Sequence, residues 1–121
     1  LQEMTKVFGV KILISEYTHD QLREDSQFEC RELGAVSVRG RQQPVRLYEV
    51  MNADDPDLRQ SKRSTRGLHE AGLAHFRNGD LAQAAQSWRD CLALSPEDPV
   101  THYWLQRCEQ QNPSKQTLGV V

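Results

Sequence analysis

RELGAVSVRGRQQPVRLYEV, residues 31–50, predicts two β-strands joined by a short basic turn. Before the turn, Val36 and Val38 flank a polar residue, and after the turn Val45 and Leu47 do the same. This alternation of apolar and polar residues is typical of strands that bury one face. The stretch therefore predicts a β-hairpin with one side in the core.

The turn of this hairpin combines a glycine with two cations. Gly40 lies between Arg39 and Arg41, and glycine allows a tight backbone turn that strains other residues. Two guanidinium groups then project from one place, and the guanidinium fork matches the geometry of phosphate oxygens. The turn predicts a phosphate contact, with a solvated basic turn as the alternative.

Upstream of the hairpin, the sequence predicts a helix, a strand and a second helix. Residues 1–8 are typical of the end of a helix, with Gly9 as its stop. Apolar side chains at positions 10, 12 and 14 predict a strand with one buried face, and Ser15 suits the N-cap of the following helix. The polar residues 23–27 predict a loop.

As a set, these elements resemble the C-terminal part of the catalytic domain of class III adenylyl and guanylyl cyclases. That family has an ILIS strand, a short helix, an RELG segment, a V-[KR]-G-[KR] turn and a closing P-V-x-[LIV]-Y-E-V strand. All of them occur in this order within residues 1–51. The resemblance implies an α+β fold, namely the C-terminal portion of a ferredoxin-like cyclase domain with strands and a short helix.

The resemblance also implies an activity for the parent protein, which would convert ATP or GTP to the cyclic nucleotide and pyrophosphate with Mg²⁺ or Mn²⁺. In the family a Lys or Arg of the turn contacts the triphosphate; by position this is Arg41, with Arg39 as second choice. The family's metal-binding aspartates and its N-x-x-x-R helix precede the position of Leu1, so no residue here is assigned to a metal or another cofactor. The family's active sites form between two catalytic domains, which implies a homodimer.

After the hairpin the composition changes, and residues 52–66 predict a solvated linker. This segment lacks apolar periodicity, contains Pro56 and shifts from acidic to basic. From Gly67 the pattern becomes helical, and residues 67–112 predict a helical hairpin plus one further helix. Residues 113–121 are predicted to be a C-terminal tail.

The helical hairpin resembles a tetratricopeptide repeat, a helix-turn-helix unit of about 34 residues. Gly72 stands at the small position where the two helices cross, and Gly79 lies in the turn before Asp80, which suits an N-cap. Trp88 takes another signature position, and the third helix is expected to cover the exposed face of the repeat. A lone repeat is too small to be stable alone. We therefore expect it to pack on its own third helix or on the cyclase-like part, and to bind a protein partner.

Bulk composition narrows the classes of function. The net charge of −2 does not favour nucleic acid binding, and no apolar run is long enough to span a bilayer. The three cysteines and four histidines lack metal-ligand spacing, so the cysteines are predicted to be reduced thiols in a cytoplasmic protein. Because the family pattern is already under way at Leu1, the chain is expected to be a fragment. The resemblance suggests a bacterial parent and leaves room for a membrane anchor upstream.

The sequence therefore predicts a fragment of a nucleotide cyclase, with adenylyl cyclase favoured and guanylyl cyclase as the alternative, with a tetratricopeptide-like tail and a role in intracellular signalling. The alternative is a non-catalytic interaction module, in which the tail binds a partner and the cyclase-like remnant is scaffold.

Overall fold

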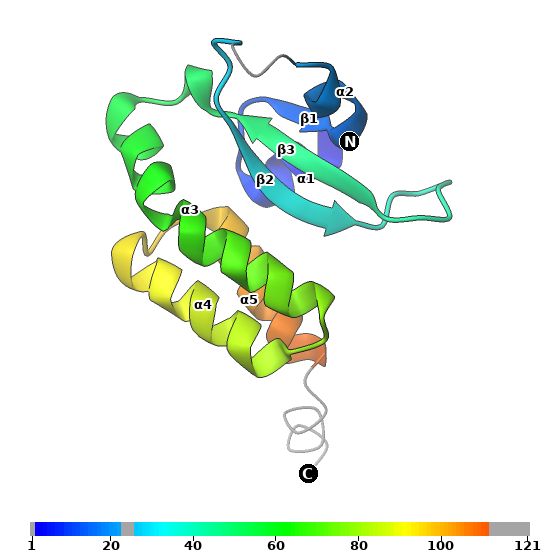
Figure 1. Cartoon of the computed structure of the whole chain (residues 1–121), viewed down its shortest axis with the longest axis vertical. Coiled ribbons are helices and arrows are strands. Elements are labelled where there is room, and N and C mark those ends of the chain that lie inside the picture. The colour runs from blue at the N-terminus through cyan, green and yellow to red at the C-terminus, as the bar shows by residue number, and fades with distance from the viewer. Residues whose placement is uncertain (1, 23–25, 112–121) are drawn as a thin grey trace. The chain divides into compact units, whose positions relative to one another are not determined.

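The computed structural model describes residues 2–22 and 26–111. The chain divides into two compact units, residues 1–60 and 61–121 (Figure 1). The first unit contains all the strands that the structure describes, and the second contains helices.

The described elements follow the chain in the order α1 (Gln2–Phe8), β1 (Leu13–Ser15), α2 (Glu16–Gln21), β2 (Cys30–Val36), β3 (Val45–Val50), the short 3-10 helix η1 (Met51–Ala53), α3 (Pro56–Arg77), α4 (Leu81–Leu94) and α5 (Pro99–Gln111). Strands and helices together agree with the predicted α+β class. Two predicted segments, residues 23–25 of the loop and the tail over 113–121, lie outside the described residues.

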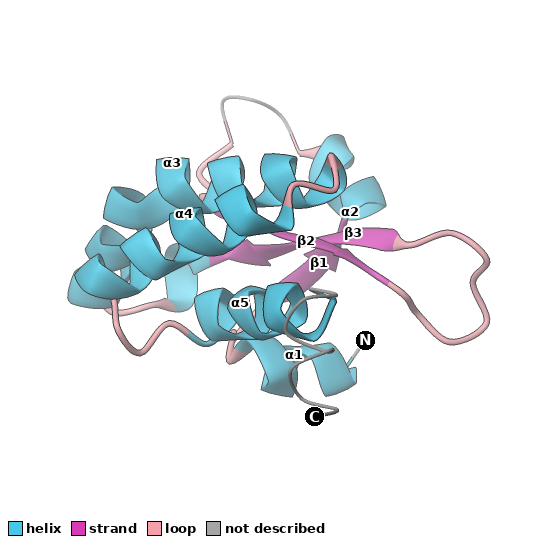
Figure 2. Cartoon of the chain, turned by 90° about the horizontal axis from the view of Figure 1, so that it is seen from below, coloured by secondary structure: helices cyan, strands magenta, loops and turns pink. Residues whose placement is uncertain are grey.

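The predicted hairpin is confirmed, and it supplies two of the strands of the sheet in the first unit. Strand β3 lies in the centre of the antiparallel sheet β1-β3-β2, and Val36 pairs with Val45 at the end next to the turn. Figure 2 shows the strands in magenta, with the turn between β2 and β3 projecting beyond them. The buried apolar residues of this unit are Phe8, Val10, Leu33, Val36, Leu47, Val50 and Met51.

The first helix ends as predicted, whereas the strand after it is shorter than predicted. Gly9 has a φ of 62°, in the left-handed region where glycine commonly stops a helix. The strand expected over residues 10–14 is only Leu13–Ser15, and Ile12 is 40% exposed rather than buried. The reason is that β3 ends at Val50, whose N–H donates to the carbonyl of Ile12, so the ladder has no partner further upstream.

Residues 52–66 do not form a solvated linker, which corrects the sequence prediction. Helix α3 begins at Pro56, well before Gly67, because proline fits the first helical turn, where its missing N–H is not needed. The buried residues of α3 are Lys62, Thr65, His69, Gly72 and Leu73. Since the first part of this buried face is polar, apolar periodicity does not reveal it.

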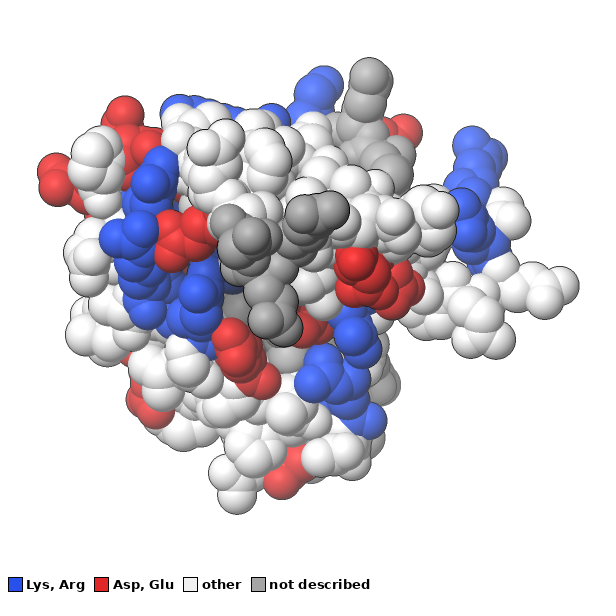
Figure 3. All heavy atoms as spheres, turned by 45° about the horizontal axis from the view of Figure 1, so that its top comes forward, with Lys and Arg blue, Asp and Glu red and all other residues white. Residues whose placement is uncertain are grey.

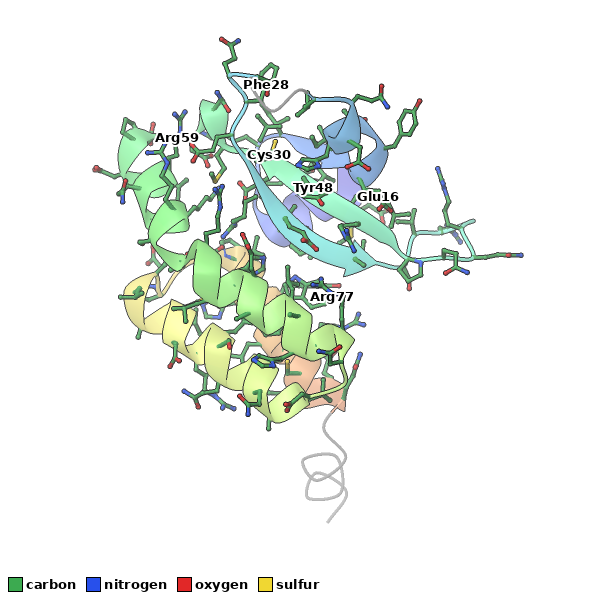
Figure 4. All side chains as sticks on the ribbon, in the orientation of Figure 1. Glu16, Phe28, Cys30, Tyr48, Arg59 and Arg77 are labelled. Carbon is green, nitrogen blue, oxygen red and sulfur yellow. The ribbon has the colours of Figure 1, made fainter. Side chains whose placement is uncertain are left out.

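Hydrogen bonds of Arg59 connect the start of α3 to the residues that follow β3. Its Nε donates to the carbonyl of Met51 at 3.1 Å, and its Nη2 donates to the carbonyl of Asn52 at 2.7 Å. The Asn52 side chain accepts a hydrogen bond from the N–H of Glu29 at 2.8 Å and donates to the carbonyl of Gln27 at 2.9 Å. Backbone groups are thus satisfied where β3 is followed by η1. Arg59 is labelled in Figure 4.

The second unit packs around Trp88, which is fully buried. The predicted N-cap of α4 is confirmed, since Asp80 Oδ1 accepts a hydrogen bond from the N–H of Gln83 at 3.3 Å. The Trp88 ring stacks on Trp104 of α5, with 5.9 Å between ring centroids and 13° between planes, so the third helix does cover the hairpin. A β-carbon at Gly72 would lie 2.7 Å from Cε2 of Trp88, and the crossing of α3 and α4 therefore requires a glycine.

Candidate functional site at the basic turn

The turn between β2 and β3 carries both predicted arginines. Gly40 has a φ of 85°, and the N–H of Arg41 donates to the carbonyl of Val38 at 3.0 Å, which closes the turn. Arg39 and Arg41 are both exposed, and Figure 3 shows basic atoms at the projecting end of the molecule. A tight turn at Gly40 is as predicted, but residues 37–44 connect the strands, so the connection is longer than expected and Val38 lies outside β2. A contact of the arginines with phosphate stays a prediction.

A hollow of about 470 Å³ lies beside this turn and distinguishes the two arginines. It is lined by Ser15, Glu16 and Tyr17 on one side and by residues 40–45 on the other. Arg41 belongs to this lining, whereas Arg39, although exposed in the same turn, does not. Of the two arginines, Arg41 therefore lies at the hollow, and a role for either one in binding stays a prediction.

The walls of the hollow carry an acid, an aromatic ring and amides besides the arginine. Oε1 of Glu16 accepts a hydrogen bond from the N–H of Arg46 at 3.4 Å, which ties α2 to the start of β3. Tyr17 is 74% exposed, and Gln42 and Gln43 are exposed on the opposite wall. The hollow thus presents anionic, aromatic, amide and cationic groups within one concave surface.

Helix α2, which supplies one wall, is held against the sheet by a stacked pair of rings. The ring of His19 lies on that of Tyr48, with 3.7 Å between centroids and 2° between planes. Burial raises the pKa of Tyr48, which is labelled in Figure 4. Its hydrogen bond with Arg46, together with the Glu32 carboxylate 3.5 Å from Nε of Arg46, raises the pKa of that guanidinium. Glu16 and Tyr17 are therefore positioned by a helix that packs on the sheet rather than by a loop.

A buried ion pair, which the sequence did not reveal, lies on the other face of the hairpin. Nη2 of Arg31 lies 2.6 Å from Oε2 of Glu49, its Nε donates to the same oxygen at 2.8 Å, and both side chains are 1% exposed. A bulge between Glu32 and Gly34 sets this pairing, because without the shift Glu49 would face Glu32. Gly34, with a φ of 110°, was the available signal, since glycine within a strand often marks a bulge.

Within residues 2–22 and 26–111, no group of three or more His, Cys, Asp or Glu is arranged to hold a metal ion. Binding of the metals that the cyclase resemblance implies stays a prediction for the complete protein. His69 has a structural role that the sequence did not reveal. Its side chain is buried in the second unit, and its Nδ1 accepts a hydrogen bond from Nε1 of Trp88 at 3.0 Å.

The cysteines Cys30, Cys91 and Cys108 are free thiols, and burial raises the pKa of Cys108 to about 11. None of the helices in the described part of the chain combines the length and apolarity needed to cross a membrane.

The chain is similar in sequence to an adenylate cyclase. It is 24% identical over 110 residues to the protein named "Adenylate cyclase, terminal-differentiation specific" of Dictyostelium discoideum. The match covers 90% of this chain and 5% of that protein, so the chain spans only a small part of its relative. No protein-family model matches the chain, and no solved structure matches it.

This similarity extends into the helical unit. The aligned length of 110 residues is more than twice that of the cyclase-like residues 1–51, so the alignment must include helices that follow them. The relation to the adenylate cyclase therefore covers the hairpin unit together with the helical unit. The resemblance of the helices to a tetratricopeptide repeat stays a prediction.

Proposed function

We propose that this chain is the C-terminal part of a class III adenylyl cyclase catalytic domain followed by a tetratricopeptide-like tail. The complete protein would convert ATP to cyclic AMP and pyrophosphate. The similarity to an adenylate cyclase supports this proposal. The observation that carries it is the position of Arg41, because the turn residue that the resemblance assigns to the triphosphate lines a hollow of about 470 Å³. Small-molecule sites have volumes of about 300–1,000 Å³.

Arg41 acts in this proposal by stabilising charge. Its guanidinium donates hydrogen bonds to oxygens of the triphosphate, and it offsets the negative charge that develops on the departing pyrophosphate. Gly40 and the bond from Arg41 to Val38 fix the backbone of the turn, so the guanidinium starts from a defined place. Mg²⁺ or Mn²⁺ belongs to this chemistry in the complete protein, and its ligands would come from outside the residues described.

The proposal also includes an assembly and a location. Active sites of the family form between two catalytic domains, so a homodimer is expected through the cyclase-like unit. The helical unit would bind a protein partner, and the catalytic part would act in the cytoplasm.

The test is cyclic AMP formation by the complete protein with ATP and Mn²⁺. Arg41→Ala is expected to lower kcat about 100-fold, the scale of losing one charge-stabilising group, and Arg41→Lys is expected to lower it much less. Arg39→Ala is the matched control, because Arg39 is exposed in the same turn but does not line the hollow. Its kcat should stay close to that of the wild type.

Three outcomes count against parts of the proposal. Unchanged kcat in Arg41→Ala would show that Arg41 does not contribute to catalysis and is only part of the turn. Equal losses of kcat in Arg41→Ala and Arg39→Ala would show that the total positive charge of the turn matters, rather than a contact made by Arg41. A complete protein that forms no cyclic AMP would favour the non-catalytic interaction module. The chain by itself is expected to be inactive.

A further inference from the structure

His69 of α3 is a titratable side chain buried inside the helical unit. It is 1% exposed, and its Nδ1 lies 3.0 Å from Nε1 of Trp88, which α4 buries completely. An indole N–H can only donate a hydrogen bond, so Nδ1 of His69 must be the acceptor. The imidazole is therefore neutral in the folded unit, and it carries its proton on Nε2.

Protonation of His69 would break this hydrogen bond. The second proton would go to Nδ1, where it would face the indole N–H across 3.0 Å. Two donors would then oppose each other, and a charge would be left in a buried site. The indole has little room to turn away, because it stacks on Trp104 and α3 crosses it closely at Gly72. A protonated His69 is therefore compatible with an opened helical unit rather than with the packed one.

The buried titratable groups of the three helices determine whether a charge on His69 would find a counter-ion. Helix α4 contributes the thiol of Cys91, and α5 contributes the thiol of Cys108, whose pKa is raised by burial to about 11. Helix α3 itself contributes Lys62, which is a cation like a protonated imidazole, and the half-buried Arg66 lies one turn before His69. None of these groups is a carboxylate.

Asp98 is the carboxylate that this unit buries among the residues described, and it caps α5. Both of its oxygens accept hydrogen bonds from the first turn of α5. The hydroxyl of Ser95, just before this cap, contacts that of Ser61 at 3.0 Å. Ser61 precedes His69 by eight residues, which is about 12 Å along a helix. Asp98 is therefore engaged at the helix start rather than beside His69.

We propose that His69 and Trp88 form a pH-sensitive switch, which keeps the helical unit packed near neutral pH and opens it on acidification. The inference does not depend on the proposed function. Histidine in an unfolded chain becomes protonated below about pH 6.5, so unfolding then takes up a proton that the packed unit excludes. The equilibrium constant for unfolding should therefore rise about tenfold for each further pH unit. A partner that binds the packed helices would be released over the same range.

Urea unfolding of the whole chain between about pH 5.5 and pH 7.5 tests this inference. Tryptophan fluorescence reports on the helical unit, because both tryptophans belong to it. The urea midpoint of the wild type should fall as the pH falls. His69→Asn places an amide oxygen near the position of Nδ1, which keeps an acceptor for Trp88 that does not titrate. Whatever its absolute stability, its midpoint should lose this dependence on pH. His102→Gln is the matched control, since it removes an exposed histidine of the same unit and should keep the slope of the wild type.

A measurement on the wild type decides the question even if His69→Asn does not fold. The ¹⁵N chemical shifts of the imidazole show which ring nitrogen carries the proton. Nδ1 of His69 should be the unprotonated nitrogen at pH 7, and the ring should still be neutral in the folded protein at about pH 5.5. A wild-type midpoint that is constant over this pH range, an equal slope in His69→Asn, or a folded protein with a protonated His69 would each overturn the inference.

Discussion

Replacing Gly72 by alanine tests the packing of the helical unit at its tightest point. A β-carbon at this position would lie 2.7 Å from Cε2 of Trp88 and 3.0 Å from its Cδ2 and Cζ2. Carbon atoms in favourable contact are about 3.5–4.0 Å apart. The indole cannot move away without cost, because it stacks on Trp104 and donates a hydrogen bond to His69.

The expected magnitude follows from two opposing effects. Alanine is more favourable than glycine in a helix interior by about 1 kcal/mol. Overpacking a well-packed core costs about 1–3 kcal/mol. Gly67→Ala isolates the first effect, because Gly67 lies in the same helix and a β-carbon there meets no atom within 4 Å. Gly72→Ala is therefore expected to be less stable than Gly67→Ala by about 1–3 kcal/mol.

Urea unfolding followed by tryptophan fluorescence measures this difference in the right part of the protein. The sequence contains 2 tryptophans, Trp88 and Trp104, and both belong to the second unit. The two alanine variants share the gain in helix propensity, so the difference in their free energies of unfolding reports the clash alone. If Gly72→Ala proved as stable as Gly67→Ala, the close crossing of α3 and α4 at Trp88 would be refuted.

The remaining predictions concern buried polar groups. Arg31→Met is expected to destabilise the first unit by about 3–5 kcal/mol, because it deprives a buried Glu49 of this ion pair; the double variant Arg31→Met/Glu49→Leu should recover most of that loss. Hydrogen exchange of β3 measures both, and equal losses in the single and double variants would contradict the expectation. Burial raises the pKa of Cys108 from 9.0 to about 11, so its thiolate fraction at pH 8 should be about 100-fold below that of an unperturbed thiol. Mass spectrometry can follow the alkylation of Cys108 by iodoacetamide. The alkylation rate should increase by a similar factor when urea unfolds the second unit. As the pH rises, the Cys108 thiol ionises in the unfolded chain before it does in the folded one. The free energy of unfolding of the second unit should therefore fall between about pH 9 and pH 11. A free energy of unfolding that does not change over this range would argue against a buried thiol.

The hairpin could be predicted because a period of two along residues 31–50 directly reflects which side chains share a face of a strand. The bulge at Gly34 could not be predicted from the same alternation. A bulge changes the residue that lies opposite, and that depends on the partner strand as much as on the local sequence. For this reason the partners Arg31 and Glu49, far apart in the chain, were missed.

Only the part of the candidate site that lies in the turn could be predicted from the sequence. Arg39 and Arg41 flank Gly40 in sequence, so their closeness needs no tertiary information. Glu16 and Tyr17 reach the hollow from α2, and only the packing of that helix on the sheet brings them there. The early start of α3 was missed for a related reason: its buried face is partly polar, and residues of its first turns make specific hydrogen bonds that a hydrophobic pattern does not record.

The bonds of Arg59 determine where the protein can be divided for expression of the sheet by itself. A cut after Met51, where the cyclase-like pattern ends, removes Asn52 and Arg59 together. The N–H of Glu29 and the carbonyl of Gln27 would then lose their hydrogen bonds to the Asn52 side chain, and Met51 would lose the hydrogen bond from Arg59. A cut after Gln60 keeps the first turn of α3, which has too few residues to be helical alone and would depend on Arg59 for its order. The useful expression boundary therefore lies inside a helix.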